Sequence, residues 1–234
     1  GFVALAANDV VAQTNDAAAQ ELLAGAASEA PVYQQIKAKF IDGGVGFMAA
    51  VLLCLILGLA VAIERIIYLS LSTTNTSKLI AKVEEALNNG GVEAALEICR
   101  NTRGPVASIY YQGLSRMDQG LEAVEKSVIS YGGVQAAQLE TGLTWLSLFI
   151  AMAPNLGFLG TVIGMIGAFD AIQAAGDISP IVVASGIKVA LITTVAGLIV
   201  ALILQVFFNY ITSKVESLVI TMEDASVSLI DILV

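Results

Sequence analysis

Three threonines occur inside long apolar stretches of the chain, where a polar side chain is uncommon. Thr161 interrupts the stretch 151–169, and Thr193 and Thr194 interrupt the stretch 186–205. Each hydroxyl can donate to the backbone carbonyl one helical turn earlier, which is a common arrangement for threonine in lipid. Alternatively, several copies of the chain could place these hydroxyls around a narrow, hydrated pore. The spacing of the residues leaves both interpretations open.

Four charged residues lie at the ends of apolar stretches, where ionisable groups are costly and are commonly functional or interfacial. Asp170 and Lys188 fall close to the same boundary. A snorkelling side chain or a surface ion pair explains them better than an ion-binding site. Glu64 and Arg65 follow the first apolar stretch, where an interfacial anchor is favoured over a gate.

The composition indicates an integral membrane protein. Of the 234 residues, 57% are hydrophobic and 13% are charged, and the mean hydropathy is +0.82. Soluble domains carry about 25% charged residues. The net charge of −9 and the scattered Lys and Arg residues argue against nucleic-acid binding.

The residue types also argue against an enzyme or a metal centre. Histidine is absent, which removes the commonest general base and metal ligand. The two cysteines, Cys54 and Cys99, are too few for a disulfide framework or a zinc site. No nucleophile, phosphate-loop or zinc-protease motif occurs. We therefore expect no catalytic activity, no cofactor and no metal.

A row of small residues runs along one face of each apolar stretch that carries the threonines. Small side chains let helix backbones approach closely in a membrane. The two rows therefore predict helix packing within one subunit and between subunits. The first row is Ala153, Gly157, Gly160, Gly164, Gly167 and Ala171, and the second is Gly186, Ala190, Thr194, Gly197 and Ala201.

The hydropathy pattern predicts an all-α protein with three transmembrane helices, at 44–71, 141–171 and 181–211. A helical water-soluble region, 72–140, separates the first two spans, with a turn at Asn88–Gly91 inside it. Residues 172–180 form a turn between the last two spans, and 212–234 continue the third span as a C-terminal helix.

The distribution of basic residues predicts the orientation in the membrane. Seven Lys and Arg residues lie between Arg65 and Lys126, and Lys214 follows the third span, so this side is expected to be cytoplasmic. The N-terminal segment, 1–43, and the 172–180 turn then lie in the periplasm. Residues 1–13 read equally as the end of a signal-like segment or as a short interfacial helix.

Several of these residues also carry a resemblance. The run AMAPNLGFLGTVIGMIGAF, the run ITTVAGLIVAL and the Glu64–Arg65 pair resemble the MotA/TolQ/ExbB family, and the layout is most similar to its ExbB branch. The resemblance covers about residues 44–213. It implies a homopentamer in the bacterial inner membrane whose second and third spans line a pore around ExbD-like single-span partners. Each partner would supply a membrane aspartate.

The resemblance implies an ion-driven motor. Proton or sodium flow would drive force across the periplasm, through a TonB-like protein, to energise TonB-dependent outer-membrane transport. Thr161 and Thr194 match the family's pore-lining threonines, and Thr193 adds a further hydroxyl. Val189 stands where related chains often carry a glutamate, so the titrating carboxylate is expected from the partner. A TolQ-like or motility-type motor, or a passive oligomeric scaffold, are the alternatives.

Overall fold

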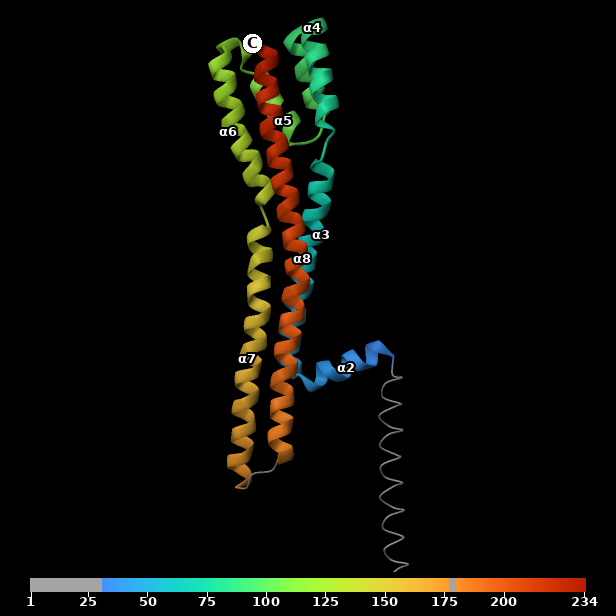
Figure 1. Ribbon diagram of the computed structural model, residues 1–234, viewed down its shortest axis with the longest axis vertical. Coiled ribbons are helices and arrows are strands. Elements are labelled where there is room, and N and C mark those ends of the chain that lie inside the picture. The colour runs from blue at the N-terminus through green and yellow to red at the C-terminus, as the bar shows by residue number, and fades with distance from the viewer. Residues whose placement is uncertain (1–30, 177–179) are drawn as a thin grey trace, which may run out of the picture.

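The computed structural model describes residues 31–176 and 180–234, and every regular element in these ranges is a helix. Figure 1 shows an elongated bundle in which α3, α7 and α8 run along one half and α4, α5 and α6 surround α8 in the other. The elements are α2 (Val32–Asp42), α3 (Val45–Ser72), α4 (Thr76–Asn101), α5 (Pro105–Leu114), η1 (Met117–Gln119), α6 (Leu121–Glu140), α7 (Leu143–Ala175) and α8 (Pro180–Leu233).

Three helical stretches of the described chain are long and apolar enough to cross a membrane. They contain α3, α7 and α8, and their most apolar windows are largely exposed on the surface of the single chain. Such exposure fits helices that face lipid or another chain. The predicted all-α fold with three spans and a helical region between the first two is confirmed.

The longest element is α8, which has 54 residues and is unbroken. At 1.5 Å per residue it extends for about 80 Å. It therefore continues well past a hydrocarbon layer of about 30 Å. The same rigid helix packs against α7 and α3 in one half of the bundle and against α5 and α6 in the other.

Two glycines with positive φ set the helix breaks that matter for this arrangement. Gly91 has φ 73° and ψ −169° and kinks α4 inside the predicted turn. Gly142 has φ 88° and separates α6 from α7. Because residues with a Cβ rarely adopt this conformation, glycine is required at both positions. Gly142 thereby allows α7 to begin as a separate helix.

In the half of the bundle that contains α4, α5 and α6, the hydrophobic core joins α5 to α8. Tyr110 is fully buried, and its hydroxyl donates to the carbonyl oxygen of Ala225 at 2.7 Å. Burial raises the pKa of Tyr110 well above its ordinary value. Leu114, Val128 and Leu229 are buried in the same hydrophobic core as Tyr110.

The N-terminal prediction falls partly outside the described residues. Residues 1–13, for which the sequence left a signal-like segment and an interfacial helix as alternatives, lie outside the described residues. The described part begins at Pro31 and leads into α2, which runs at a steep angle to the long bundle (Figure 1).

Candidate functional site

Two threonine hydroxyls meet between α7 and α8. The Oγ1 atoms of Thr161 and Thr194 are in direct contact, and both side chains are half-buried. The carbonyl oxygen of Gly157 lies 3.2 Å from Thr161 Oγ1 and 3.3 Å from Thr194 Oγ1. The carbonyl oxygen of Ala190 lies 3.1 Å and 3.3 Å from the same two atoms. These four oxygen atoms form one group, which we call the oxygen cluster.

The oxygen cluster has two hydroxyl protons to share among its oxygen atoms. If both protons went to the carbonyls, the lone pairs of the two hydroxyl oxygens would face each other, so one hydroxyl donates to the other. This leaves acceptor capacity on a carbonyl. The cluster can therefore receive a hydrogen bond or contact a partly dehydrated cation, and its protons can be redirected while the heavy atoms stay in place.

Glycine is what brings the two helices close enough for this cluster. A Cβ on Gly157 would lie 2.9 Å from the carbonyl oxygen of Thr193 and 3.1 Å from the Cα of Thr194. A Cβ on Gly197 would lie 2.5 Å from the carbonyl oxygen of Ala153. These separations are too short for a side chain, so the backbones of α7 and α8 touch at the threonines and one turn beyond them toward the start of α7.

The contact between α7 and α8 extends beyond the cluster toward the far end of both helices. A Cβ on Gly164 would lie 3.4 Å from the Cβ of Ala190. The Cβ of Ala168 then occupies the space beside Gly186. In the opposite direction, Ala201 is half-buried on the continuation of the second row.

Gly167 lies outside this contact, although the sequence places it in the first row. It is exposed, and no atom lies within 4 Å of the position that its Cβ would take. The sequence row alternates between steps of four and three residues, whereas the contact follows Gly160, Gly164 and Ala168 in steps of four. The crossing of α7 and α8 therefore moves the contact from Gly167 to Ala168.

Thr193 also differs from the expectation that it lines a pore. Its side chain is 1% exposed, and a Cβ on Gly160 would lie 2.9 Å from its hydroxyl oxygen. That hydroxyl donates to the carbonyl oxygen of Ala190 at 2.8 Å. Within one chain, Thr193 is a packing residue with its hydroxyl bonded back to its own helix.

Lys188 takes part in a surface ion pair whose partner the sequence did not indicate. Its Nζ lies 2.7 Å from Oδ2 of Asp42, at the end of α2, and both side chains are partly exposed. The hydrogen bond from Lys188 lowers the pKa of Asp42. Asp170 is exposed and makes no ion pair within the described residues. Asp42 and Lys188 lie 146 positions apart in the sequence, and no motif connects them.

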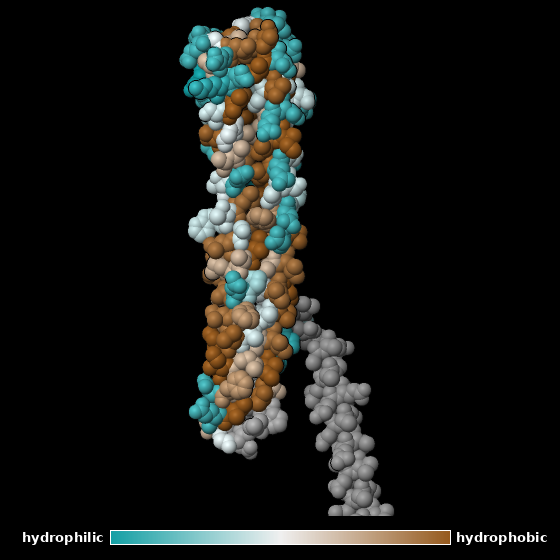
Figure 2. Space-filling view, turned by 60° about the vertical axis from the view of Figure 1, so that its left-hand side comes forward, coloured by the Kyte–Doolittle hydropathy of each residue, from teal (hydrophilic) through white to brown (hydrophobic). Residues whose placement is uncertain are grey.

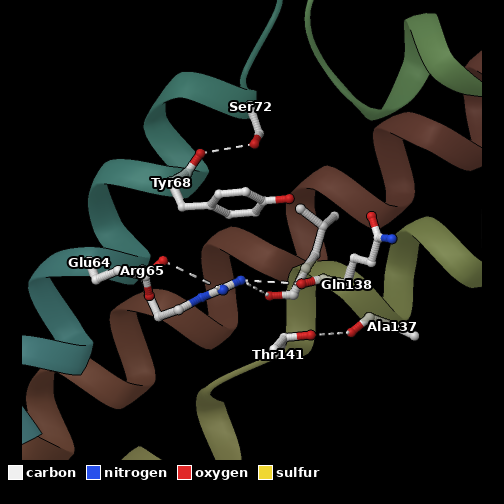
Figure 3. Close-up of polar contacts among 8 residues, drawn as sticks. Glu64, Arg65, Tyr68, Ser72, Ala137, Gln138 and Thr141 are labelled. Atoms are coloured by element: carbon white, nitrogen blue, oxygen red, sulfur yellow. Dashed lines mark hydrogen bonds and ion pairs between the residues drawn. The ribbon is translucent and has the colours of Figure 1, made fainter.

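Arg65 is buried, with 6% of its surface exposed. Its Nη2 donates to the carbonyl oxygens of Gln138 at 3.2 Å and Leu139 at 3.1 Å, in the last turn of α6 (Figure 3). The ring of Tyr68 lies beside the guanidinium, with its centroid 4.6 Å from Cζ. Arg65 thus joins α3 to the end of α6 inside the protein, a contact that the sequence did not indicate, and its place near the membrane interface stays a prediction.

Glu64 is the exposed member of the pair, and its Oε1 atom lies 3.9 Å from Nη1 of Arg65. The sequence carried one signal for the difference between the two residues. Arg65 follows Ala62 and precedes Leu69 at helical spacing, and all three are buried, so Arg65 lies on the packed face of α3, which Glu64 does not share.

Figure 2 shows a paler, less hydrophobic stripe between brown flanks in the lower half of the molecule, where α7 and α8 lie. The exposed apolar side chains of α7 and α8 include Phe158, Val162, Leu198 and Leu202. These exposed apolar side chains are suited to contact lipid or another chain.

Comparison with known proteins agrees with this architecture. The model of the MotA/TolQ/ExbB proton channel family matches residues 101–224, which is more than half of the chain. The chain belongs to the MotA/TolQ/ExbB proton channel family. Since it also has three helices able to cross a membrane, it is a multi-pass inner-membrane protein of a channel family rather than of an enzyme family.

Individual members of the family place the chain nearest to ExbB. A protein of Methanothermobacter thermautotrophicus named as an ExbB homolog is 36% identical over 162 residues, which are 69% of this chain and 57% of that protein. An ExbB-like protein of Synechocystis is 31% identical over 179 residues, 75% of this chain and 70% of that protein.

Biopolymer transport protein exbB1 of Vibrio cholerae is 46% identical over 68 residues, which are 29% of this chain and 30% of that protein. The chain therefore spans little more than half of the Methanothermobacter protein and a smaller part of the Vibrio protein. The MotA/TolQ/ExbB match includes α7 and most of α8, which carry the oxygen cluster.

Proposed function

We propose that this chain is the ExbB-like subunit of an inner-membrane motor that couples ion flow to force transmitted across the periplasm. The observation that carries the proposal is the oxygen cluster, in which Thr161 and Thr194 present paired hydroxyls between two apolar helices. Membership of a proton channel family supports the assignment of this polar point to an ion path.

In this proposal five copies of the chain surround a central pore, and α7 and α8 of each copy form its wall. Single-span ExbD-like partners pass through the pore and supply the titrating aspartate. Two features support a carboxylate from outside this chain. Within the described residues, no acidic side chain bonds to Thr161 or Thr194, and Val189 has no ionisable group. The cluster would orient a water molecule or an ion against the partner's carboxylate.

The orientation belongs to the same proposal. The N-terminal segment and the α7–α8 turn would lie in the periplasm, and α4, α5, α6 and the C-terminal part of α8 in the cytoplasm. The basic residues between Arg65 and Lys126 support this assignment. The motor would energise TonB-dependent outer-membrane transport. For this, its moving part must engage a TonB-like protein on the periplasmic side.

The test separates the hydroxyl from the shape of the side chain. Thr194→Val and Thr161→Val keep the branched shape and remove the hydroxyl, while Thr194→Ser and Thr161→Ser keep the hydroxyl. We expect the valine variants to assemble with the partner and to lose ion-dependent function, and the serine variants to keep most of it. Fully active valine variants at both positions would exclude the hydroxyls from the ion path.

The coupling ion and the system served need separate measurements. Function that persists under a sodium gradient in the presence of a protonophore would assign sodium, and loss of function would assign protons. Deletion of the gene should abolish TonB-dependent uptake. Uptake that survives the deletion, together with an envelope or motility defect, would assign a TolQ-like or motility-type motor. A complex that assembles and conducts no ion would be the passive scaffold.

A further inference from the structure

Residues of four segments line a small cavity: the end of α3, the linker to α4, the start of α5 and the part of α8 from Lys214 to Thr221. Its volume is about 110 Å³. Pockets for nucleotides and other drug-sized ligands occupy about 300–1,000 Å³. The cavity therefore suits a compact group and excludes a whole nucleotide.

The cavity carries an unbalanced positive charge. Lys214 is the one charged residue that lines it, and no acidic residue does, although the whole chain has a net charge of −9. In the part of the chain that the structure describes, the ion pairs join Glu64 to Arg65 and Asp42 to Lys188. The half-buried Lys214 thus has no anionic partner there, and a bound anion would supply one.

Hydroxyl groups make up most of the remaining polar lining. The residues that carry them are Ser72, Thr73, Thr74, Thr76, Ser217 and Thr221. All of these hydroxyls except that of Ser217 donate their proton to a backbone carbonyl, for example Thr73 to Leu69 at 2.9 Å and Thr221 to Ser217 at 2.8 Å. The hydroxyl of Ser217 has no hydrogen-bond partner in the described structure, so it is free to donate to a ligand. The ammonium group of Lys214 and the hydroxyl of Ser217, one helical turn apart on α8, are therefore the two donors that the cavity offers to an oxyanion.

The cavity also lies where the first and third predicted spans end. Leu71, which is 68% exposed, is the last apolar residue of α3, and Ser72 of the cavity follows it directly. On α8, Tyr210 is exposed and Lys214 comes one helical turn later. Exposed apolar and tyrosine side chains followed by a lysine are typical of the boundary between hydrocarbon and headgroups. Phosphate groups of the bilayer are therefore within reach.

We propose that this cavity binds a phosphate group through Lys214 and Ser217. The phosphate belongs either to a lipid headgroup or to free inorganic phosphate, since both present the same oxyanion to the same donors. A bound headgroup would hold the ends of α3 and α8 at a fixed depth in the membrane. Such fixation matters for a subunit that resists force, but the binding itself does not depend on the proposed motor.

The test uses the purified full-length chain in detergent, with two probes. Retained phosphatidylglycerol is counted by native mass spectrometry, and inorganic phosphate is titrated while the thermal unfolding temperature is followed. Lys214→Gln should weaken binding of the relevant probe by about tenfold or more, because a charged hydrogen bond is lost. Lys214→Arg keeps the charge and should bind, and Lys126→Gln, which removes an exposed lysine on α6, is the matched control.

The results also assign the source of the phosphate. Retention of phosphatidylglycerol that depends on Lys214 identifies a lipid headgroup, and stabilisation by inorganic phosphate that depends on Lys214 identifies free phosphate. If Lys214→Gln does not fold, Ser217→Ala replaces it, because this change removes a hydroxyl that holds no part of the fold together. Equal binding of both probes by wild type and by the folded variant would overturn the proposal.

Discussion

At the scale of single residues, the account depends on how close α7 and α8 come at the threonines. The Cα of Gly197 lies against α7, because a Cβ there would meet the carbonyl of Ala153 at 2.5 Å and the Cα of Gly157 at 3.3 Å. Backbone atoms cannot move aside in the way that a flexible side chain does. The contact of Thr161 with Thr194 therefore requires glycine at position 197.

Gly197→Ala is expected to push α7 and α8 apart. The loss of close packing should lower the free energy of unfolding by about 1–3 kcal/mol, as overpacked sites do. The shift should also weaken ion-dependent function by separating Thr161 from Thr194. Gly167→Ala is the matched control, because nothing lies within 4 Å of its Cβ position. Thermal unfolding in detergent measures both variants, and equal unfolding temperatures for the two would contradict the packing argument.

The pair between Asp42 and Lys188 predicts a dependence on pH. The ion pair lowers the pKa of Asp42 from its ordinary value of 3.8. A carboxyl with a lowered folded-state pKa stabilises the fold above its unfolded-state pKa and loses this effect as the pH falls through the folded-state pKa. Wild type should therefore unfold at a higher temperature than Asp42→Asn at pH 7, and the difference should vanish in strong acid.

Asp170→Asn is the control for this measurement, because Asp170 makes no ion pair within the described residues. A difference between wild type and Asp42→Asn that persists unchanged in strong acid would show that the ion pair is not its cause.

At the scale of helices, Arg65 joins the end of α6 to α3. Its guanidinium donates to the carbonyls of Gln138 and Leu139 in the last turn of α6, where few helical N–H groups remain, and the carbonyl of Gln138 also accepts from the N–H of Thr141. Gly142 follows with positive φ, and a Cβ there would lie 3.0 Å from Cδ of Arg65. The break between α6 and α7 is thus built around this side chain (Figure 3).

Arg65→Met should destabilise the protein by about 1.5–3 kcal/mol, because the charged hydrogen bonds to Gln138 and Leu139 are lost. Glu64→Gln is the neighbouring control, and it should change stability by less than about 1 kcal/mol, since exposed ion pairs contribute little. Chemical denaturation in mixed micelles can compare the two. If Glu64→Gln proved as destabilising as Arg65→Met, the exposed ion pair would matter more than the bonds to the carbonyls.

The helices were more predictable than the contacts between them. Long apolar runs and the 3.6-residue period follow from the local sequence, so the three-span, all-helical fold could be predicted. The choice of Ala168 over Gly167 depends on the crossing of α7 and α8, which no local pattern encodes. The same holds for the burial of Thr193 and for the pairing of Lys188 with Asp42, because each depends on a partner distant in sequence.

At the scale of the whole molecule, α8 connects the two halves of the bundle. The same helix carries Thr194 between apolar flanks and, about 30 residues later, the buried contact with Tyr110. The backbone of α8 therefore connects the oxygen cluster to the contact with α5 without a break.

The proposed orientation predicts which surfaces a membrane-impermeant maleimide reaches. Cys54 and Cys99 are buried, and burial raises the pKa of Cys99 to about 11, so the native thiols should react little. Gln173→Cys, on the exposed end of α7, should be labelled from the periplasmic side. Ser130→Cys, exposed on α6, should be labelled only after permeabilisation. The reverse pattern would invert the topology.

The most direct test of the central claim is ion flux through the assembled complex in proteoliposomes. The complex of the chain with its single-span partner is compared with the same complex carrying Thr161→Val and Thr194→Val together, and with the double serine variant. The account predicts flux for wild type and the double serine variant, and loss of flux for the double valine variant at unchanged assembly. Flux through the double valine variant equal to that of wild type would contradict it.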